Sequence, residues 1–313
     1  MLEREQEQLL AWLDRTLRWE GSATSVRRIS EGHSREMVVV APEGFDRVVV
    51  RIEQGGVFGT NGSEECRVMS ALHSFDVPIA EIVARDLAGE VMGRPFFVMK
   101  YVDHDDKLPS PVDDFITVLD RLHHIDVSDA RFAEVFALGI PPDARTATIA
   151  QVHRWRDIYR SAVDRPNELL ELAAIWLEKN APHGDAMSIV HGDAGPGNFV
   201  HDGKKVVALT DWEFSHVGNR LEDWVFCIQM RGSRALPKDE WFGKLEAATG
   251  IVISKSDWLY WETFNYFKGS CANITCRRLY ETGINPAPNM AIVGTALHRM
   301  FLRRVVELID LAN

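Results

Sequence analysis

The stretch IVHGDAGPGN at residues 189–198, followed by TDWE at residues 210–213, decides the fold and chemistry that this sequence predicts. It spaces Asp193, Asn198 and Asp211 along one short segment. Phosphoryl transfer needs a carboxylate that takes the proton of the attacking hydroxyl, and hard oxygen ligands that hold Mg²⁺ against the phosphates. Asp193 suits the first role, and Asn198 and Asp211 suit the second.

The segment between the two candidate metal ligands predicts a β-hairpin. Residues 199–209 are rich in apolar β-branched residues and are interrupted by Asp202-Gly203, a dipeptide that favours a tight turn. A hairpin returns the chain on itself, so Asn198 and Asp211 should emerge at the same end. The glycine-rich loop before it suits a backbone that bends sharply close to charged ligands.

The first hundred residues predict an antiparallel sheet combined with helices. Apolar residues at helical spacing predict an amphipathic helix over residues 3–19, and the following β-like runs read as a meander. A Gly-rich loop leads into a second helix and two more strands. The expected strands are residues 25–30, 37–42, 47–52, 79–85 and 94–102, and the second helix is residues 63–75.

The rest of the chain has mainly helical periodicity, as at residues 115–123, 152–163 and 168–180. A polar, Pro-containing stretch after Val102 marks the change of character. We therefore expect an α+β protein with two lobes: a nucleotide-binding lobe over residues 1–102, and a catalytic and acceptor-binding lobe over residues 103–313.

The order H-x-D-x-x-x-x-N, followed by a metal-binding Asp, resembles the catalytic segments of protein kinases. Gly192 at the protein-kinase Arg position, and Asp-Trp-Glu in place of Asp-Phe-Gly, make the chain more similar to the aminoglycoside phosphotransferase and choline kinase group of small-molecule kinases. Residues 285–309 resemble the end of a bacterial phosphotransferase branch and of kinase-like domains fused to some acyl-CoA dehydrogenases. The resemblance implies a protein-kinase-like bilobal fold, with an N-lobe antiparallel sheet of about five strands plus helices and a mainly helical C-lobe with a short β-hairpin.

The same resemblance implies a nucleotide site. Arg51 in VVVRIE matches a residue that contacts the phosphates and pairs with a helix Glu, here Glu65. The family usually carries Lys at that position, and Arg presents a planar fork instead of a point charge. An ordinary surface ion pair is an equal alternative for this pair. The other implied nucleotide contacts are the loop residues Gly32, His33 and Ser34 and the linker residues Lys100, Tyr101 and Val102.

Three further residues are expected to have supporting roles. His191 is expected to buttress the catalytic loop, and Asp223 in the stretch VGNRLED to anchor it. Glu213 would complete the metal shell or hold a lysine.

Composition argues against several other classes of function. The net charge of −11 and a pI near 5.5 argue against a nucleic-acid partner, which usually needs a basic stripe. No apolar run reaches about 18 residues, so no membrane anchor is expected. Four cysteines without CxxC spacing predict reduced thiols and a cytoplasmic protein. The histidines show no HExxH spacing and predict no zinc site.

The sequence thus predicts an enzyme that moves the γ-phosphoryl group of ATP or GTP to a hydroxyl of a small molecule, with Mg²⁺ as cofactor. The acceptor stays open among aminoglycosides, macrolides, choline, sugars, amino alcohols and hydroxyacyl thioesters. Acidic residues Glu307 and Asp310 favour a cation, and the aromatic segment 258–267 favours an apolar group or simple core packing. The alternatives are a nucleotide-binding pseudokinase and a protein kinase, and the oligomeric state is open.

Overall fold

The computed structural model describes residues 1, 3–21, 24–29, 35–54, 56–105, 107–184 and 186–312. The expected phosphate loop residues Gly32, His33 and Ser34 lie outside these ranges, so that assignment stays a prediction.

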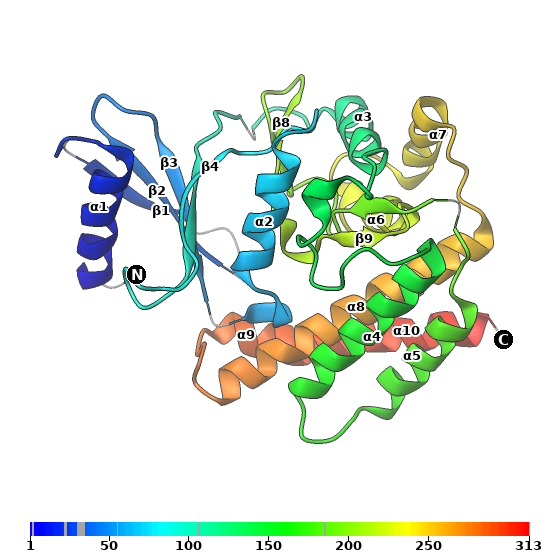
Figure 1. The fold of residues 1–313 in the computed structure, drawn as a ribbon. Helices are drawn as coiled ribbons and strands as arrows, with labels where there is room; N and C mark the ends of the chain where they lie inside the picture. The colour runs from blue at the N-terminus through cyan, green and yellow to red at the C-terminus, as the bar shows by residue number, and fades with distance from the viewer. Residues whose placement is uncertain are drawn as a thin grey trace.

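The N-terminal part contains one five-stranded antiparallel sheet in the order β1-β2-β3-β5-β4, as predicted (Figure 1). Strand β3 lies in the middle and is buried along its first five residues, which explains its continuous apolar run. The strands are β1 (Thr24–Ile29), β2 (Arg35–Pro42), β3 (Val48–Glu53), β4 (Ile82–Asp86) and β5 (Phe96–Lys100).

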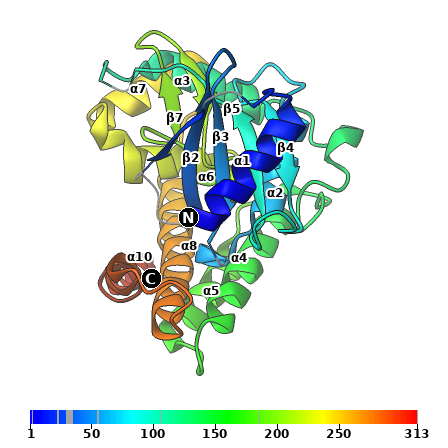
Figure 2. The same cartoon turned by 90° about the vertical axis from the view of Figure 1, so that its left-hand side faces the viewer.

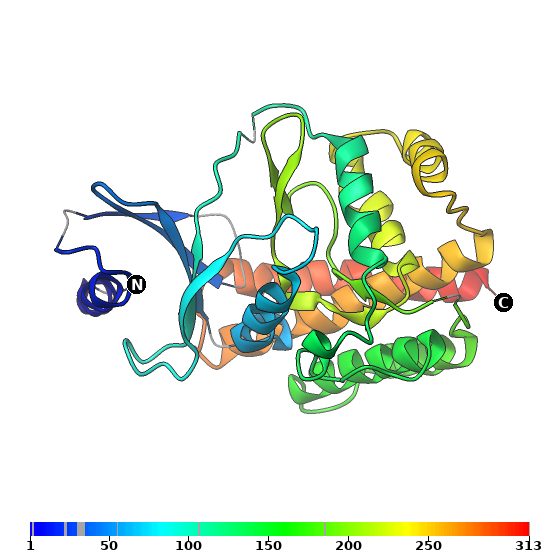
Figure 3. The same cartoon turned by 45° about the horizontal axis from the view of Figure 1, so that its top comes forward.

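Two helices cover the two faces of this sheet. Helix α1 (Glu3–Leu17) lies across the outer face and packs Leu9 and Leu13 on β2, β3 and β5 (Figure 2). Helix α2 (Gly62–Leu72) lies between the sheet and the C-terminal part, where Figures 1 and 3 both place it. Its apolar side belongs to a core that runs on without a break into the C-terminal part.

The C-terminal part is mainly helical, as expected. Its central element is α8, whose aromatic segment supplies the buried residues Trp261, Phe264 and Phe267, so core packing was the correct alternative for that segment. The helices are α3 (Val112–His123), α4 (Ala144–Ser161), α5 (Glu168–Asn180), α6 (Leu221–Phe226), α7 (Lys238–Thr249), α8 (Lys255–Glu281), α9 (Pro288–Ile292) and α10 (His298–Leu311). Short 3₁₀ turns are η1 (Val57–Gly59), η2 (Ala130–Phe132), η3 (Trp212–Phe214) and η5 (Gly232–Arg234), and π-helical turns are η4 (Cys227–Arg231) and η6 (Val293–Leu297).

Two small antiparallel pairs lie within the helical part. The expected hairpin forms from β7 (Phe199–His201) and β8 (Val206–Leu209), with Gly203 at a φ of 87° in the turn. A second pair, β6 (Ser188–Val190) with β9 (His216–Gly218), was missed because each strand has only three residues. These pairs flank the segments that carry the candidate catalytic residues.

Most helix and strand ends lie within a few residues of the predicted ones, but α4 begins eight residues before the predicted residue 152. Helix α2 ends at Leu72 rather than residue 75, and α4 begins at Ala144, where Asp143 caps it by accepting from Thr146 N. No described helix has both the length and the apolar character needed to cross a membrane. The division at residue 102 stays a prediction.

Candidate active site

Asp223 on α6 holds the backbone of the loop that follows β6. Its carboxylate accepts the N–H groups of His191 and Gly192, both at 2.8 Å, and lies 2.9 Å from His123 Nε2. Burial alone would raise the pKa of this fully buried group, but the hydrogen bonds and the neighbouring histidines outweigh it and lower the pKa. Asp223 therefore makes the contacts that an anchor of the loop requires.

A buried lysine supports the same loop from α8. Lys268 Nζ donates to the Gly192 carbonyl oxygen at 2.6 Å and to Glu222 Oε1 at 2.7 Å. Glu222 also lies 3.1 Å from His216 Nε2, and the attraction of Lys268 and His216 outweighs burial and lowers the pKa of Glu222. A buried charge pair with these extra hydrogen bonds fixes one loop geometry, since breaking it leaves an uncompensated charge.

Gly192 allows the loop to pass close to the segment after Asp211. Its φ is 82°, and a Cβ atom there would lie 2.4 Å from the Phe214 carbonyl oxygen. Any side chain would force the two segments apart. Steric crowding therefore explains why this structure has a glycine at the position where protein kinases have an Arg.

His191 joins the two catalytic segments. Its Nε2 lies 2.9 Å from the Thr210 carbonyl oxygen, and its Nδ1 accepts the N–H of Asp193 at 3.3 Å. These partners require a neutral ring with the proton on Nε2. Burial lowers the pKa of His191, which favours that neutral form. A buttress of the loop would make these contacts, and that role of His191 stays a prediction.

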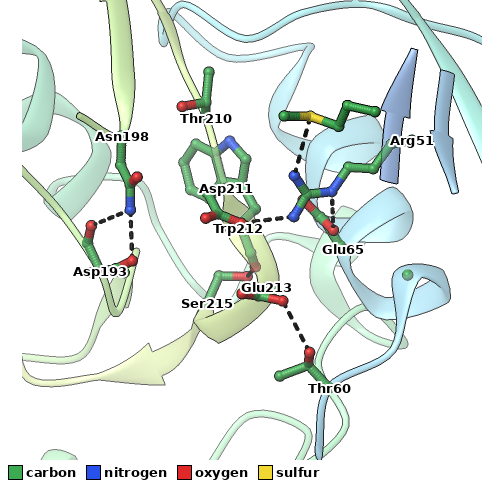
Figure 4. A network of polar contacts seen from close by, with 12 residues as sticks. Arg51, Thr60, Glu65, Asp193, Asn198, Thr210, Asp211, Trp212, Glu213 and Ser215 are labelled. Atoms are coloured by element: carbon green, nitrogen blue, oxygen red, sulfur yellow. Dashed lines mark hydrogen bonds and ion pairs between the residues drawn. The ribbon is translucent and has the colours of Figure 1, made fainter. Parts of the chain in front are cut away.

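Asn198 and Asp211 do emerge at the same end of the hairpin. Phe199 pairs with Leu209, and Thr210 N donates to the Asn198 carbonyl oxygen at 3.0 Å. The Asn198 Nδ2 group donates to the backbone oxygen of Asp193 at 2.8 Å and to its Oδ2 at 2.6 Å (Figure 4). Because the amide nitrogen is used in this way, the amide oxygen is left as the side-chain group that can bind a cation.

Asp211 has an unusual backbone and a cationic partner. It adopts φ 66° and ψ 61°, a left-handed conformation that non-glycine residues rarely take outside turns and functional sites. Arg51 Nη2 donates to Asp211 Oδ1 at 2.7 Å, so the N-terminal sheet reaches the predicted metal ligand directly (Figure 4). Burial raises the pKa of Asp211, but Arg51 outweighs it and the pKa falls below its ordinary value.

The ion pair of Arg51 with Glu65 is buried, so the alternative of a surface ion pair was wrong. Arg51 Nε donates to Glu65 Oε2 at 2.8 Å, and the two side chains are 7% and 1% exposed. Burial opposes the charge of Arg51, yet Glu65, Asp211 and Glu213 outweigh it and raise the pKa of the guanidinium. One arginine therefore neutralises carboxylates from α2 and from the segment after the hairpin.

Glu213 makes a further contact between the two parts of the chain. Its Oε2 accepts a hydrogen bond at 3.1 Å from Thr60 Oγ1, just before α2 (Figure 4). Phe58 in η1 also packs edge-on against Phe214, with ring centroids 5.9 Å apart. These contacts tie the candidate metal segment to the loop between β3 and α2.

The predicted linker has most of its backbone groups already bonded. Lys100 N donates to the Glu81 carbonyl oxygen and Tyr101 N to that of Arg47, at 2.9 and 3.0 Å. The Val102 carbonyl oxygen accepts from His104 Nδ1 at 2.8 Å. Within the described residues, the N–H of Val102 has no protein acceptor. Of the three linker residues, Val102 is thus the one whose backbone N–H has no acceptor among the described residues.

Sequence reasoning missed Arg231, which contacts the candidate catalytic carboxylate. Its Nε donates to Asp193 Oδ1 at 2.8 Å and its Nη2 to Oδ2 at 2.5 Å, a bidentate pair. Arg231 ends the π-helical turn η4, and Asp223 lies on the same continuous helix two turns earlier. The spacing of Asp223, Cys227 and Arg231, four residues apart, was the available signal, because such residues share one helix face.

The oxygen atoms of Asn198 and Asp211 fit a Mg²⁺ ion that is shared with a substrate better than a metal ion that is bound by protein side chains alone. In the described ranges, no group of three or more His, Cys, Asp or Glu side chains could hold a metal ion. Mg²⁺ usually takes only one or two protein oxygens and completes its shell with water and substrate phosphates. The Asn198 amide oxygen and the Asp211 carboxylate, which is 29% exposed, fit that requirement.

Comparisons with known proteins agree with this geometry. The profile of the phosphotransferase enzyme family matches residues 25–259. Human acyl-CoA dehydrogenase family member 11 is 27% identical over 260 residues, which cover 72% of this chain and 33% of that protein. The chain thus spans about a third of the length of the curated relatives it matches.

Solved structures share the fold at low identity. A choline kinase from Streptococcus pneumoniae superposes with a TM-score of 0.64 and 13% identity, covering 95% of this chain and 99% of that one. A macrolide 2'-phosphotransferase from Brachybacterium faecium gives a TM-score of 0.57 and 16% identity, covering 91% and 98%. The protein-kinase-like bilobal fold that was predicted is therefore confirmed.

Proposed function

The chain belongs to the phosphotransferase enzyme family, and from this premise we propose that it is a kinase of small molecules. It transfers the γ-phosphoryl group of ATP or GTP to a hydroxyl. The observation that carries the proposal is the convergence of Asp193, Asn198 and Asp211 at one end of the β7–β8 hairpin. That set supplies a base and two hard oxygen ligands within one site.

Asp193 is the proposed catalytic base. The acceptor oxygen forms a bond to the γ-phosphorus while the bond from that phosphorus to the β–γ bridging oxygen breaks, and the nucleoside diphosphate leaves. The hydroxyl proton passes to the Asp193 carboxylate. Asn198, His191 and the Lys268 and Asp223 anchors hold that carboxylate in place before the reaction. Positioning of this kind supplies much of the acceleration in phosphoryl transfer.

Asn198 and Asp211 are the proposed ligands of Mg²⁺. When bound, the ion neutralises charge that develops on the transferred phosphoryl group and on the leaving diphosphate. Arg51 holds Asp211 in its strained conformation and keeps it ionised. Glu213 is held by Thr60 and is proposed as an outer contact of this site.

The nucleotide is proposed to lie between the sheet and the helical part. Arg51 and the loop residues Gly32, His33 and Ser34 would steady the phosphates, while the N–H of Val102 would donate to the base. This division corresponds to lobes over residues 1–102 and 103–313. Buried free cysteines fit a reducing compartment, and we propose the cytoplasm.

Thermal stability with nucleotide tests the proposal. A ligand held at about 100 times its Kd stabilises a protein by about 2.7 kcal/mol. We expect MgATP or MgGTP to raise the melting temperature, with a smaller effect when EDTA removes the metal. Consumption of the triphosphate in the presence of a hydroxyl compound should follow. Nucleotide stabilisation without transfer to any acceptor would favour the pseudokinase, and no stabilisation would refute both.

A further inference from the structure

Two arginines from one helix lie over the glycines of the candidate catalytic loop. A Cβ atom at Gly195 would lie 2.8 Å from Arg231 Cβ. One at Gly197 would lie 2.8 Å from Arg234 Nη1 and 3.3 Å from Arg231 Nη1. Both guanidinium groups therefore approach the same point above the loop, beside the Asp193 carboxylate.

The two guanidinium groups at this point have one carboxylate in direct contact, and Asp211 adds an attraction to Arg231 at longer range. Arg231 pairs with Asp193, whereas Arg234 has no carboxylate partner among the described residues and donates only to the Pro196 carbonyl oxygen at 3.4 Å. Arg231 Nη1 likewise has no acceptor among the described residues. In a chain of net charge −11, an unbalanced guanidinium beside the reacting group is a specific feature of the site.

The Asp193 carboxylate already accepts three of the about four hydrogen bonds that its two oxygens can hold, so little of it is left for a substrate hydroxyl. Arg231 binds both oxygens and Asn198 binds one of them. The Arg231 side chain is 19% exposed, so an arriving group can reach it. An anionic group is the natural competitor, because guanidinium binds carboxylate and phosphate in the same bidentate way.

We propose that the acceptor is a hydroxylated anion whose carboxylate or phosphate is bound by Arg231 and Arg234, which places its hydroxyl at Asp193. This inference rests on the proposed kinase function and names the acceptor class. Binding of the oxyanion draws Arg231 from Asp193 and leaves a carboxylate oxygen for the hydroxyl proton.

The same charges disfavour a cationic acceptor at this position. A protonated amino alcohol or aminoglycoside would meet two guanidinium groups, and like charges in contact oppose binding. Glu307 supplies no free counter-charge, because it is paired with Arg303 and Arg304 on α10.

The test compares acceptors that differ by one charge. Hydroxycarboxylic acids of increasing chain length, their primary amides, matched hydroxyalkyl phosphates and amino alcohols are assayed with MgATP for kcat and KM. Binding of the same compounds is measured with a non-hydrolysable nucleotide. We expect an anion to exceed its neutral counterpart in kcat/KM by tenfold or more, about 1.4 kcal/mol. The better of the two anions, acid or phosphate, identifies the source of the oxyanion.

Two variants locate the effect. Arg234→Gln should raise KM for the anion and bring the acid-to-amide ratio near one, without changing the KM for nucleotide. Arg234→Glu should shift preference toward amino alcohols. The control Arg4→Gln replaces an exposed arginine on α1, across the sheet from the site, and should change nothing.

The outcomes separate the two proposals. If MgATP and MgGTP failed to raise the melting temperature of the wild type and of every variant, the kinase function itself would be refuted. Nucleotide stabilisation with no preference for anions in either transfer or binding would overturn the acceptor inference alone. An equal loss with every acceptor in Arg234→Gln, or a raised KM for nucleotide, would also overturn it, because the arginine would then act on the donor phosphates.

Discussion

The two arginine–aspartate pairs of the site are similar in chemistry and different in setting. Arg51 comes from the central strand of the sheet, is 7% exposed and contacts both Asp211 and Glu65. Arg231 comes from the C-terminal part, is 19% exposed and contacts Asp193 alone among the carboxylates of the described residues. One pair joins two parts of the chain, while the other lies at the proposed acceptor site.

This difference separates a permanent contact from an exchangeable one. Removing one partner from a buried charge network leaves the others uncompensated and costs several kcal/mol. A pair that solvent can reach at its edge loses less, because water and ions partly replace the partner. We therefore expect the Arg51 pair to persist through the reaction and the Arg231 pair to open in each cycle.

The largest effect is expected at the aspartate of the exchangeable pair. Asp193→Asn should lower kcat by about 10²–10⁴-fold, because a general base is lost. Stabilisation by MgATP should stay near that of the wild type, since Asp211 and Arg51 are unchanged. Steady-state kinetics and melting curves check this, with Asp310→Asn on α10 as an exposed control. Turnover near the normal rate in Asp193→Asn would show that another group takes the proton.

The permanent pair should dominate stability. Arg51→Met leaves Glu65 and Asp211 without their cation and should lower the free energy of unfolding by about 3–5 kcal/mol. Urea unfolding measures this directly. Arg277→Met is the matched control, because it breaks an exposed helical pair with Glu281 and should cost about 0.5 kcal/mol or less. Similar losses in both variants would contradict a buried structural role for Arg51.

His191, which contacts the backbone of both catalytic segments, should make the free energy of unfolding depend on pH. The folded pKa of His191 lies below its ordinary value of 6.5, so below that pH the unfolded chain binds a proton that the folded chain does not. Stability should fall as pH drops through this window, by up to about 1.4 kcal/mol per pH unit from this group. His298, whose pKa is also lowered by burial, adds in the same direction.

The measurement compares urea unfolding of the wild type and His191→Gln between pH 7 and 5.5. Glutamine carries no titrating proton, so the variant should show a shallower loss on acidification while retaining the part due to His298. Parallel slopes in the two proteins would mean that His191 is protonated in the folded state.

The smaller effect on stability is expected at the exchangeable arginine. Arg231→Gln should lower the free energy of unfolding by about 1–3 kcal/mol, less than Arg51→Met, because Asp193 is the only carboxylate that loses its partner and it keeps its bond from Asn198. A loss as large as that of Arg51→Met would place both pairs in the same class and remove the contrast between them.

Local chemistry explains why much of the site was predictable from sequence. The glycine-rich loop, the Asp202-Gly203 turn and the positions of Asn198 and Asp211 all lie within one short segment, so their proximity follows from a single hairpin. The sheet order could also be anticipated up to β3, because its first strands form a meander.

Contacts between distant segments could not be predicted in the same way. Arg231 reaches Asp193 across 38 residues and Lys268 reaches Gly192 across 76, and each contact depends on how α6 and α8 pack. The burial of Arg51 with Glu65 likewise depends on how the C-terminal part covers α2, and the local sequence does not predict that packing. Tertiary packing determines these contacts, whereas the spacing of residues along one segment determines the hairpin.

The π-helical turn η4 has a consequence for how such a site can diverge in evolution. A π turn carries one residue more than a regular helical turn, and that residue sets the direction in which Arg231 points. Deleting one residue from η4 would rotate the rest of that helical segment, Arg234 included, by about 100° about its axis. Asp223, which precedes the turn, would keep its hold on the loop. A single deletion would therefore move both arginines of the proposed acceptor site, while Asp193, Asn198 and Asp211, which precede the turn, keep their hairpin.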